Sequence, residues 1–358
     1  MIVPRLEIRL DRIHHNATTL VRRLGQRGIA VTGVTKASLG SPEIARELLR
    51  AGVTAIGDSR IENIEEMRRA GITAPMTLVR SAMCSQASRV VEHVDVSLNT
   101  ELDVLDRLST FAQLQHRRHG VVLMVELGDL REGILPRDLE SVARQTLRFP
   151  NLDLRGLGTN LACQSGVAPD DRNMAELSSL ASSLESKLGV TLDLVSGGNS
   201  ANLDWVLGRS DVGRINDLRL GESILLGCEP LQRRPIDDLH TDAFTLVAEV
   251  IEVKSKPTRP WGEINQTAFG PQALEPDRGS IARTILALGR QDVDPAGLRP
   301  PAGMVILGAS SDHLLVDPGG RPLRVGAEVR FQLDYSALLR AMTSPFVTRV
   351  MTRGLDPA

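Results

Sequence analysis

Two patterns of apolar and polar residues alternate along roughly the first 230 positions of the chain. Short apolar, β-branched runs are typical of buried strands, and each is followed by a stretch whose apolar spacing is typical of an amphipathic helix. We expect strands at 29–35, 53–57, 75–79, 94–98, 120–127, 153–159, 191–196 and about 212–217. Eight strand–helix alternations predict a (β/α)8 TIM barrel rather than an open doubly wound sheet.

The pattern changes after Pro230. Residues 231–240 are polar and charged, which suggests a linker. The segments that follow resemble strands with no long helix between them. They lie at 243–253, 282–288, 303–308, 313–316, 327–333 and 346–351.

Two domains are therefore expected. Residues 6–10 also alternate between apolar and polar positions and predict one more strand near the N-terminus. We expect a barrel over residues 10–230, followed by a C-terminal all-β domain over residues 231–358. That second domain should also take in the N-terminal strand, within residues 1–10.

Composition narrows the classes of function. The chain has 42 basic and 44 acidic residues, a net charge of −2, with the two signs interspersed, so no nucleic-acid-binding face is expected. Three widely separated cysteines offer neither a disulfide framework nor a zinc pattern. No apolar run approaches membrane-spanning length, and the N-terminus has no signal core. We expect a cytoplasmic protein with no metal.

Candidate chemistry gathers at the ends of the expected strands, where TIM barrels carry their active sites. Lys36 directly follows strand 29–35. A lysine after a strand is often simply solvated, but at a barrel mouth it can hold a carbonyl cofactor as a Schiff base. Glycine-rich turns follow the seventh and eighth strands, at 197–200 and 220–222, where phosphate sites recur in this fold. Such glycines can also serve the turns alone.

Several motifs in this order resemble the alanine racemase family of barrel-type pyridoxal phosphate enzymes, and within it the ornithine racemases. They span both expected domains. The motifs are Val34-Thr-Lys36-Ala, Gly158-Thr-Asn160-Leu-Ala-Cys163, Ser196-Gly-Gly-Asn-Ser200-Ala, Arg214-Ile-Asn-Asp-Leu-Arg219-Leu-Gly-Glu222, Gly308-Ala-Ser-Ser311-Asp312-His313 and Ala341-Met-Thr-Ser344-Pro-Phe-Val.

The resemblance implies residues that hold the cofactor. Lys36 would be the Schiff-base lysine and one of two racemisation bases. The turn containing Asn199 and Ser200, with backbone amides near Gly221 and Glu222, would hold the phosphate.

Further positions are implied around the pyridine ring. Arg219 would contact the ring nitrogen; an always-protonated arginine disfavours protonation of that nitrogen, which favours racemisation over transamination. Asn160 takes the place of a histidine that lies against the ring in alanine racemases. Arg131 corresponds to an arginine that helps to hold the ring hydroxyl and the substrate carboxylate. Ser344 falls near a tyrosine that contacts the phosphate.

The second base departs from the family pattern. Racemisation needs a proton donor on each face of the α-carbon, but segment 287–291 has no tyrosine at the matching place, and Tyr335 reads as structural. The segment containing Ser311 resembles the active-site loop of ornithine decarboxylases. By that likeness Ser311 would be the donor, Asp312 would pair with the distal ammonium of the substrate, and His313 could activate the serine or transfer the proton itself.

These implications describe a homodimeric racemase with shared active sites, acting on ornithine or, second, on lysine, with pyridoxal phosphate on Lys36. Two alternatives remain. One is a decarboxylase of the same fold, which the absence of a cysteine at Ser311 disfavours. The other is a non-enzymatic pyridoxal phosphate carrier resembling single-barrel proteins, which lack a second domain.

Overall fold

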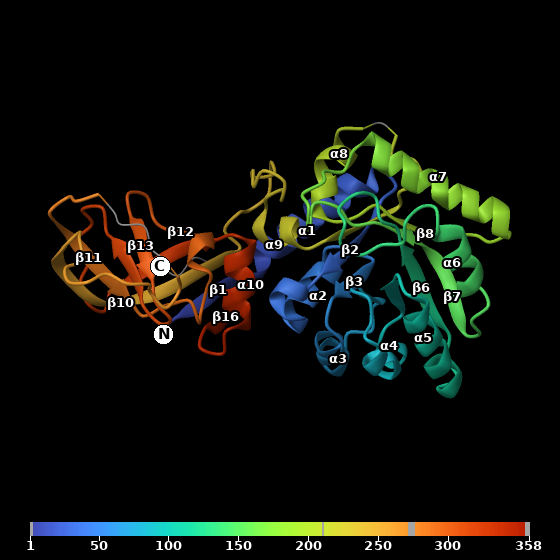
Figure 1. Ribbon diagram of the computed structural model, residues 1–358, viewed down its shortest axis with the longest axis horizontal. Helices are drawn as coiled ribbons and strands as arrows, with labels where there is room; N and C mark the ends of the chain where they lie inside the picture. Colours follow the sequence, from blue (N-terminus) through green and yellow to red (C-terminus); the bar gives the residue numbers. More distant parts are fainter. Residues whose placement is uncertain (1–2, 210, 271–275, 355–358) are drawn as a thin grey trace. The chain divides into compact units, whose positions relative to one another are not determined.

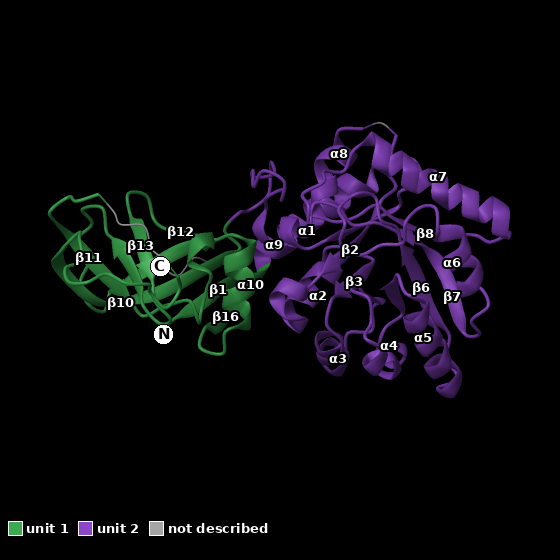
Figure 2. Ribbon diagram, viewed as in Figure 1, with its two compact units in different colours: residues 1–10, 242–358 green, residues 11–241 purple. Residues whose placement is uncertain are grey.

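The computed structural model describes residues 3–209, 211–270 and 276–354, and the chain divides into two compact units (Figure 2). One unit holds residues 11–241 and the other combines residues 1–10 with 242–358. The polar segment 231–240 belongs to the unit of residues 11–241, which we call the barrel unit. The backbone amide of its last residue, His240, donates to Asn16 Oδ1 at 2.7 Å. The His240 carbonyl oxygen accepts a hydrogen bond from Asn16 Nδ2 at 2.8 Å. No helix in the described ranges is both long and apolar enough to span a membrane.

Within the described part of residues 11–241, eight parallel strands close into a barrel, which confirms the expected fold (Figure 1). The strands are β2 (Ala30–Val34), β3 (Ala55–Asp58), β4 (Met76–Leu78), β5 (Val96–Asn99), β6 (His119–Met124), β7 (Leu152–Gly158), β8 (Leu194–Ser196) and β9 (Asp217–Leu220). The helices are α1 (Leu10–Gly25), α2 (Pro42–Arg50), α3 (Ile61–Arg69), α4 (Ala87–His93), α5 (Leu102–Leu114), α6 (Leu139–Thr146), α7 (Asp171–Leu188), α8 (Leu203–Leu207) and α9 (Glu222–Leu226).

Local sequence signals set where several of these helices begin and end. The Ser41 hydroxyl accepts a hydrogen bond from the Ile44 amide, and Pro42 opens α2 without needing a donor. A reciprocal capping box between Asp170 and Asn173 begins α7. Gly189 ends that helix with a φ of 65°, a conformation that glycine adopts without strain.

The expected position of the eighth strand was wrong. The apolar run near residues 212–217 is not the strand; β9 begins at Asp217 and contains Arg219. Two charged residues inside a strand are tolerated here because the barrel supplies partners for both side chains. Register confirms the shift, since Thr32 of β2 pairs with Arg219.

The unit that combines residues 1–10 with 242–358 is built on one sheet. Its central strands are antiparallel and ordered β12-β15-β10-β11-β14-β13. Strand β1 pairs antiparallel with β10 and parallel with β16, so the N-terminal strand joins this sheet as expected. The strands are β1 (Arg5–Arg9), β10 (Phe244–Pro257), β11 (Ser280–Leu286), β12 (Leu298–Arg299), β13 (Val305–Ala309), β14 (Leu314–Asp317), β15 (Glu328–Leu333) and β16 (Thr348–Thr352).

One helix in this unit was not expected. Helix α10 (Tyr335–Thr343) begins where the Asp334 carboxylate accepts a hydrogen bond from the Ala337 amide at 2.9 Å. Its buried face includes Leu338 and Met342, at helical spacing. The expected β domain is therefore present, and it carries one additional helix.

Candidate active site

Four polar side chains from neighbouring strands meet inside the barrel. Ser196 bridges Asp217 and Arg219: its hydroxyl donates to the Asp217 carboxylate and accepts from Arg219 Nη1. Thr32 donates to Asp217 Oδ1 at 2.8 Å, and Arg219 Nη2 donates to the Thr159 carbonyl oxygen at 2.6 Å. All of these side chains are buried. Residues of β2, β8 and β9, with the backbone just after β7, therefore form one preorganised hydrogen-bond network.

The charges in this network affect each other's protonation. Burial raises the pKa of Asp217, and its hydrogen bonds from Ser196 and Thr32 and the nearby charge of Arg219 oppose that rise. Burial lowers the pKa of Arg219, against the attraction of Asp217. A guanidinium nevertheless stays protonated in proteins, so Arg219 presents a fixed positive charge inside the barrel.

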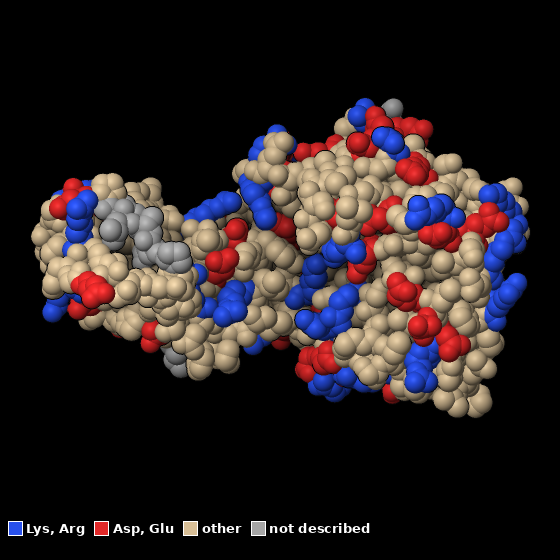
Figure 3. Space-filling model, viewed as in Figure 1, with Lys and Arg blue, Asp and Glu red and all other residues tan. Residues whose placement is uncertain are grey.

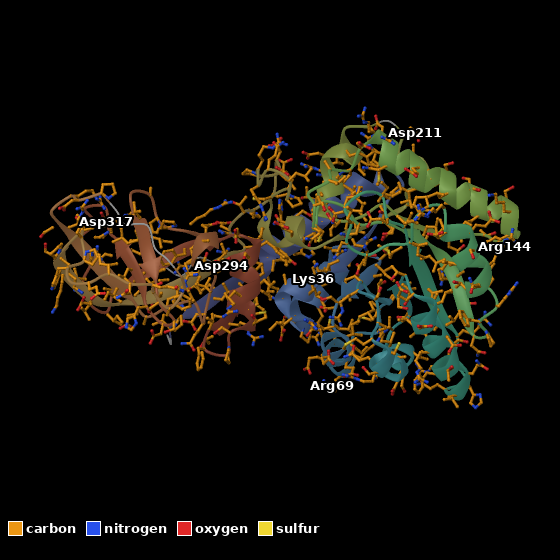
Figure 4. The ribbon with its side chains drawn as sticks, in the orientation of Figure 1. Lys36, Arg69, Arg144, Asp211, Asp294 and Asp317 are labelled. Atoms are coloured by element: carbon orange, nitrogen blue, oxygen red, sulfur yellow. The ribbon has the colours of Figure 1, made fainter. Side chains whose placement is uncertain are left out.

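Lys36 lies where β2 ends and a short 3-10 turn (Lys36–Ser38) begins, and it is labelled in Figure 4. Its side chain is half-buried, and its Nζ makes no hydrogen bond or ion pair with any residue that the structure describes. Thr32 of β2 points into the barrel, and Lys36 follows the end of the same strand. The amine is therefore available for chemistry at the mouth of the barrel.

The turns after β8 and β9 form a polar cradle. Ser200 Oγ contacts Ser223 Oγ at 3.0 Å and accepts a hydrogen bond from the Ser223 amide at 3.1 Å. Within the described ranges, the backbone amides of Ser200 and Gly221 donate to no acceptor. Gly198 is required in the first turn, because a Cβ there would lie 2.2 Å from the Asn202 side chain and its φ is 141°. Unsatisfied amides on neighbouring strand ends are suited to an anion.

Asn160 and Asn199 are joined at the edge of this cradle. Asn199 Nδ2 donates to Asn160 Oδ1 at 3.1 Å and to the Leu161 carbonyl oxygen at 2.9 Å. Asn160 Nδ2 is buried and has no hydrogen-bond partner in the structure. A buried amide without an acceptor is costly, which indicates that a bound group supplies one.

The loop after β6 carries Arg131. Glu126 holds this loop by accepting hydrogen bonds from the amides of Gly128, Leu130 and Arg131. The guanidinium of Arg131 donates to Glu132 at 3.0 Å. The charges of Arg131 and Glu132 both act on buried Arg219, which puts this loop at the same end of the barrel.

Asp129 anchors this loop to the loop after β7. Its fully buried carboxylate accepts hydrogen bonds from the amides of Cys163, Gln164 and Ser165. Burial alone would raise the pKa of Asp129, but these amides outweigh it and lower the pKa below its ordinary value. Asp129 was not singled out from the sequence, because its partners lie more than thirty positions away.

The residues of the barrel unit fit an anionic aldehyde cofactor. They supply an unpaired amine at Lys36, a buried cation at Arg219, two unsatisfied amides in the cradle and an orphaned donor at Asn160. The carboxylate of Glu222 is engaged by Arg233, so that residue could offer only its backbone to a phosphate. The sequence analysis gave no role to Ser223 or to Asp217. Asp217 stands two positions before Arg219, and the period of a strand places Asp217 and Arg219 on one face.

Ser311, Asp312 and His313 form the turn between β13 and β14 in the other unit. Asp312 contacts both neighbouring side chains: its Oδ1 accepts a hydrogen bond from Ser311 Oγ at 3.0 Å and lies 2.9 Å from His313 Nδ1. These contacts lower the pKa of Asp312, with the bond to His313 first and that to Ser311 second. Ser311 and His313 thus meet through the carboxylate rather than directly. Their expected roles stay predictions.

Ser344 has a structural setting of its own. Its hydroxyl is buried, donates to Asp292 Oδ1 at 3.2 Å and accepts from the Phe346 amide at 3.2 Å. Its expected contact with a phosphate stays a prediction. On the face drawn in Figure 3, acidic and basic side chains are interspersed over the barrel unit and no broad single-sign patch covers it.

Comparison with known sequences places this site in a family. Residues 8–228 match the family described as "Alanine racemase, N-terminal domain". A lysine racemase of Thermotoga maritima is 38% identical, and the match covers 98% of this chain and 99% of that protein. An ornithine racemase of Acetoanaerobium sticklandii is 34% identical over 97% of this chain and 99% of its own length.

Comparison with solved structures gives the same fold. An alanine racemase from a D-cycloserine-producing Streptomyces lavendulae has a TM-score of 0.75 at 20% identity, covering 99% of both chains. A D-threonine aldolase from Filomicrobium marinum has a TM-score of 0.77 at 14% identity, covering 99% of this chain and 92% of that one. At such identities the likeness shows a shared architecture alone.

Proposed function

The chain belongs to the alanine racemase family, and from this premise we propose that it interconverts the L and D forms of a basic amino acid, ornithine or lysine. The relatives similar over nearly the whole chain act on these two amino acids according to their names. The observation that carries the proposal is the unpaired amine of Lys36 at the same strand ends as buried Arg219 and the cradle of Ser200 and Gly221.

Pyridoxal phosphate is the cofactor that suits these residues. Lys36 would bind its aldehyde carbon, the cradle its phosphate and Arg219 its ring nitrogen, with Asn160 Nδ2 finding an acceptor on it. When bound, this cofactor withdraws electrons from the α-carbon of an attached amino acid, so that the α-proton becomes acidic. Arg219 would keep its positive charge beside the ring nitrogen, which would moderate this withdrawal and favour return of the proton over other outcomes.

Two groups are needed to exchange a proton on opposite faces of the α-carbon. Lys36 places an amine at the strand ends, where it would exchange the proton on its own face of the α-carbon. For the other face we propose Ser311 with His313. In that turn Asp312 lies within 3.0 Å of both side chains and orients them. Imidazole is a common general acid and base in enzymes.

Selectivity for a basic substrate would come from Asp312. Its lowered pKa keeps the carboxylate ionised, as binding of a distal ammonium requires. Arg131, held by the organised loop after β6, would take the carboxylate of the substrate. The family resemblance of the turn that contains Ser311 and Asp312 implies a loop that acts across subunits, and on that ground we propose a homodimer in which each active site is shared between subunits.

Chiral chromatography tests this function. Purified protein with pyridoxal phosphate is incubated separately with L-ornithine, L-lysine and L-alanine, and the products are separated by handedness. We expect D-ornithine or D-lysine, without the corresponding diamine, and little D-alanine. A diamine product would instead make the protein a decarboxylase, and unchanged substrates beside a lysine-bound cofactor would make it a carrier.

A further inference from the structure

The backbone that carries Lys36 is tied to the next strand of the barrel by a buried carboxylate. Thr35 immediately precedes the lysine and is fully buried, as is Asp58 at the end of β3. The Thr35 hydroxyl donates to Asp58 Oδ2 at 2.8 Å. This bond joins the end of β2 to the end of β3 by a side chain, one residue from the lysine.

The main chain of Thr35 closes the turn on which Lys36 stands. The Thr35 amide donates to the Gly57 carbonyl oxygen at 2.9 Å. The Thr35 carbonyl oxygen accepts from the Ser38 amide at 2.8 Å, from the Ser38 hydroxyl at 2.9 Å and from the Gly40 amide at 3.2 Å. Both ends of the peptide at Thr35 are thus fixed, while the Lys36 side chain makes no bond with described residues.

Asp58 is in turn fixed by the first turn of α3. Its Oδ1 accepts from the Arg60 amide at 3.0 Å and from Asn63 Nδ2 at 2.9 Å. Asn63 also packs closely against the turn of Lys36, because a Cβ on Gly40 would lie 2.6 Å from Asn63 Cβ. One carboxylate therefore gathers donors from β2, from the β3–α3 turn and from α3 around the base of the lysine.

We propose that Asp58, acting through Thr35, is a positioning residue that fixes the backbone of Lys36 while leaving its amine free to bind and release the cofactor. The inference rests on the proposed function. A fixed backbone lets the lysine leave the cofactor when substrate binds and return to the same place afterwards, since only side-chain torsions have to change. Without the tie the lysine would occupy more positions, and the bound state would be less favoured.

The test uses the full chain loaded with pyridoxal phosphate and three variants. Thr35→Val removes the donor but keeps the shape, and Thr35→Ser keeps the donor. Thr146→Val is the matched control, since Thr146 is a buried threonine of α6 whose hydroxyl bonds only the Val142 carbonyl oxygen in the described structure. Free cofactor is removed, and release is followed by the absorbance of the lysine-bound cofactor.

We expect Thr35→Val to release the cofactor about tenfold faster, as loss of one buried hydrogen bond implies. Thr35→Ser should restore release to within about twofold of the unchanged protein, and Thr146→Val should alter thermal stability alone. With L-ornithine, Thr35→Val should lower kcat more than it changes KM. Should Thr35→Val not fold, Asn63→Ala removes the second tie, keeps the Cβ that Gly40 packs against, and should act in the same direction.

Release by Thr35→Val, or by Asn63→Ala in its place, at the rate of the Thr146→Val control would overturn the proposal and leave Asp58 a purely structural residue. Failure of the proposed function looks different. In that case the unchanged protein would bind the cofactor at Lys36 without converting any amino acid, and the release rates would still decide whether Asp58 positions the lysine.

Discussion

The interior of the barrel has a polar side and an apolar side. On β2, β8 and β9 the side chains of Thr32, Ser196, Asp217 and Arg219 are buried and bonded to one another. The opposite part, centred on β5 and β6, is an apolar cluster of Leu98, Val122 and Met124.

The difference between the two sides shows where this barrel can do chemistry. Buried charges are unfavourable unless they are paired and hydrogen-bonded, so a network like that of Asp217 and Arg219 has to be assembled from several strands. The apolar side needs only shape and volume, which many sequences provide. Lys36 and the cradle stand at the strand ends of the polar side, and the apolar side supplies packing.

Among variants of the polar side, Lys36→Ala should have the largest effect on activity. Loss of the amine should lower racemisation by more than about 10³-fold, because it removes both the cofactor attachment and one base. Stability in urea should not fall, since the Lys36 side chain bonds no described residue. Chiral product analysis and urea unfolding measure the two quantities. Retained racemisation would show that another lysine carries the cofactor.

Asp217→Asn and Leu98→Ala test the two sides directly. Removing the charge of Asp217 leaves Arg219 buried without its counter-charge and should lower the free energy of unfolding by about 3 kcal/mol. Leu98→Ala should cost a similar amount, about 3 kcal/mol, through a cavity. Only Asp217→Asn should also weaken cofactor binding, because Ser196 links Asp217 to Arg219. Equal loss of cofactor binding in both variants would show that the polar and apolar sides do not differ in their effect on the cofactor site.

One strand of the apolar side, β6, begins with a buried histidine, and this histidine makes the free energy of unfolding sensitive to acid. His119 is buried at the start of β6, with Nε2 2.7 Å from Ser97 Oγ, and burial lowers its pKa to about 4. The unfolded chain, with an ordinary histidine pKa of about 6.5, then binds more protons than the folded one between these values. The free energy of unfolding should therefore fall as pH decreases from about 6.5 to 4, by about 3 kcal/mol from this residue.

His119→Gln should remove this part of the pH dependence, measured as urea unfolding between pH 7 and pH 4. His116→Asn is the control, since His116 is exposed and asparagine tolerates its φ of 53°. The same slope in His119→Gln as in the unchanged protein would show that carboxylates, rather than His119, set the acid response.

The smallest effect should come from Asp312→Asn in the other unit. The carboxylate is exposed, so its loss should lower kcat/KM for L-ornithine by only about tenfold. The value for L-norvaline, which lacks the distal amine, should fall less, because for that substrate only the orientation of Ser311 and His313 is affected. Asp317→Asn on the same hairpin is the control. If both amino acids lose activity equally, Asp312 orients Ser311 and His313 rather than binding the ammonium.

Local patterns were enough to predict most of the fold. The period of apolar residues located the strands and helices of the barrel, and strand ends located Lys36 and the glycine turns. Helix α10 was missed because it is short and lies between strands, and β9 was misplaced because it carries two charges. In both places a tertiary contact decides the structure, and periodicity does not report it.

The sequence indicated candidate site residues only where they lie at strand ends. Lys36, Ser200 and Gly221 followed from position and from family resemblance. The bond from Thr35 to Asp58 joins residues 23 positions apart, and that from Ser196 to Asp217 joins residues 21 apart. No spacing rule links such pairs, because closure of the barrel brings them together.

Proton exchange at the α-carbon tests the central claim most directly. L-Ornithine is incubated in D2O with the protein and pyridoxal phosphate, and its α-proton is followed by NMR while chiral chromatography follows D-ornithine. The account predicts loss of the α-proton signal, with deuterium at the α-carbon of the first D-ornithine formed and no putrescine. An α-proton that persists while the cofactor is bound to Lys36, or putrescine as the product, would contradict it.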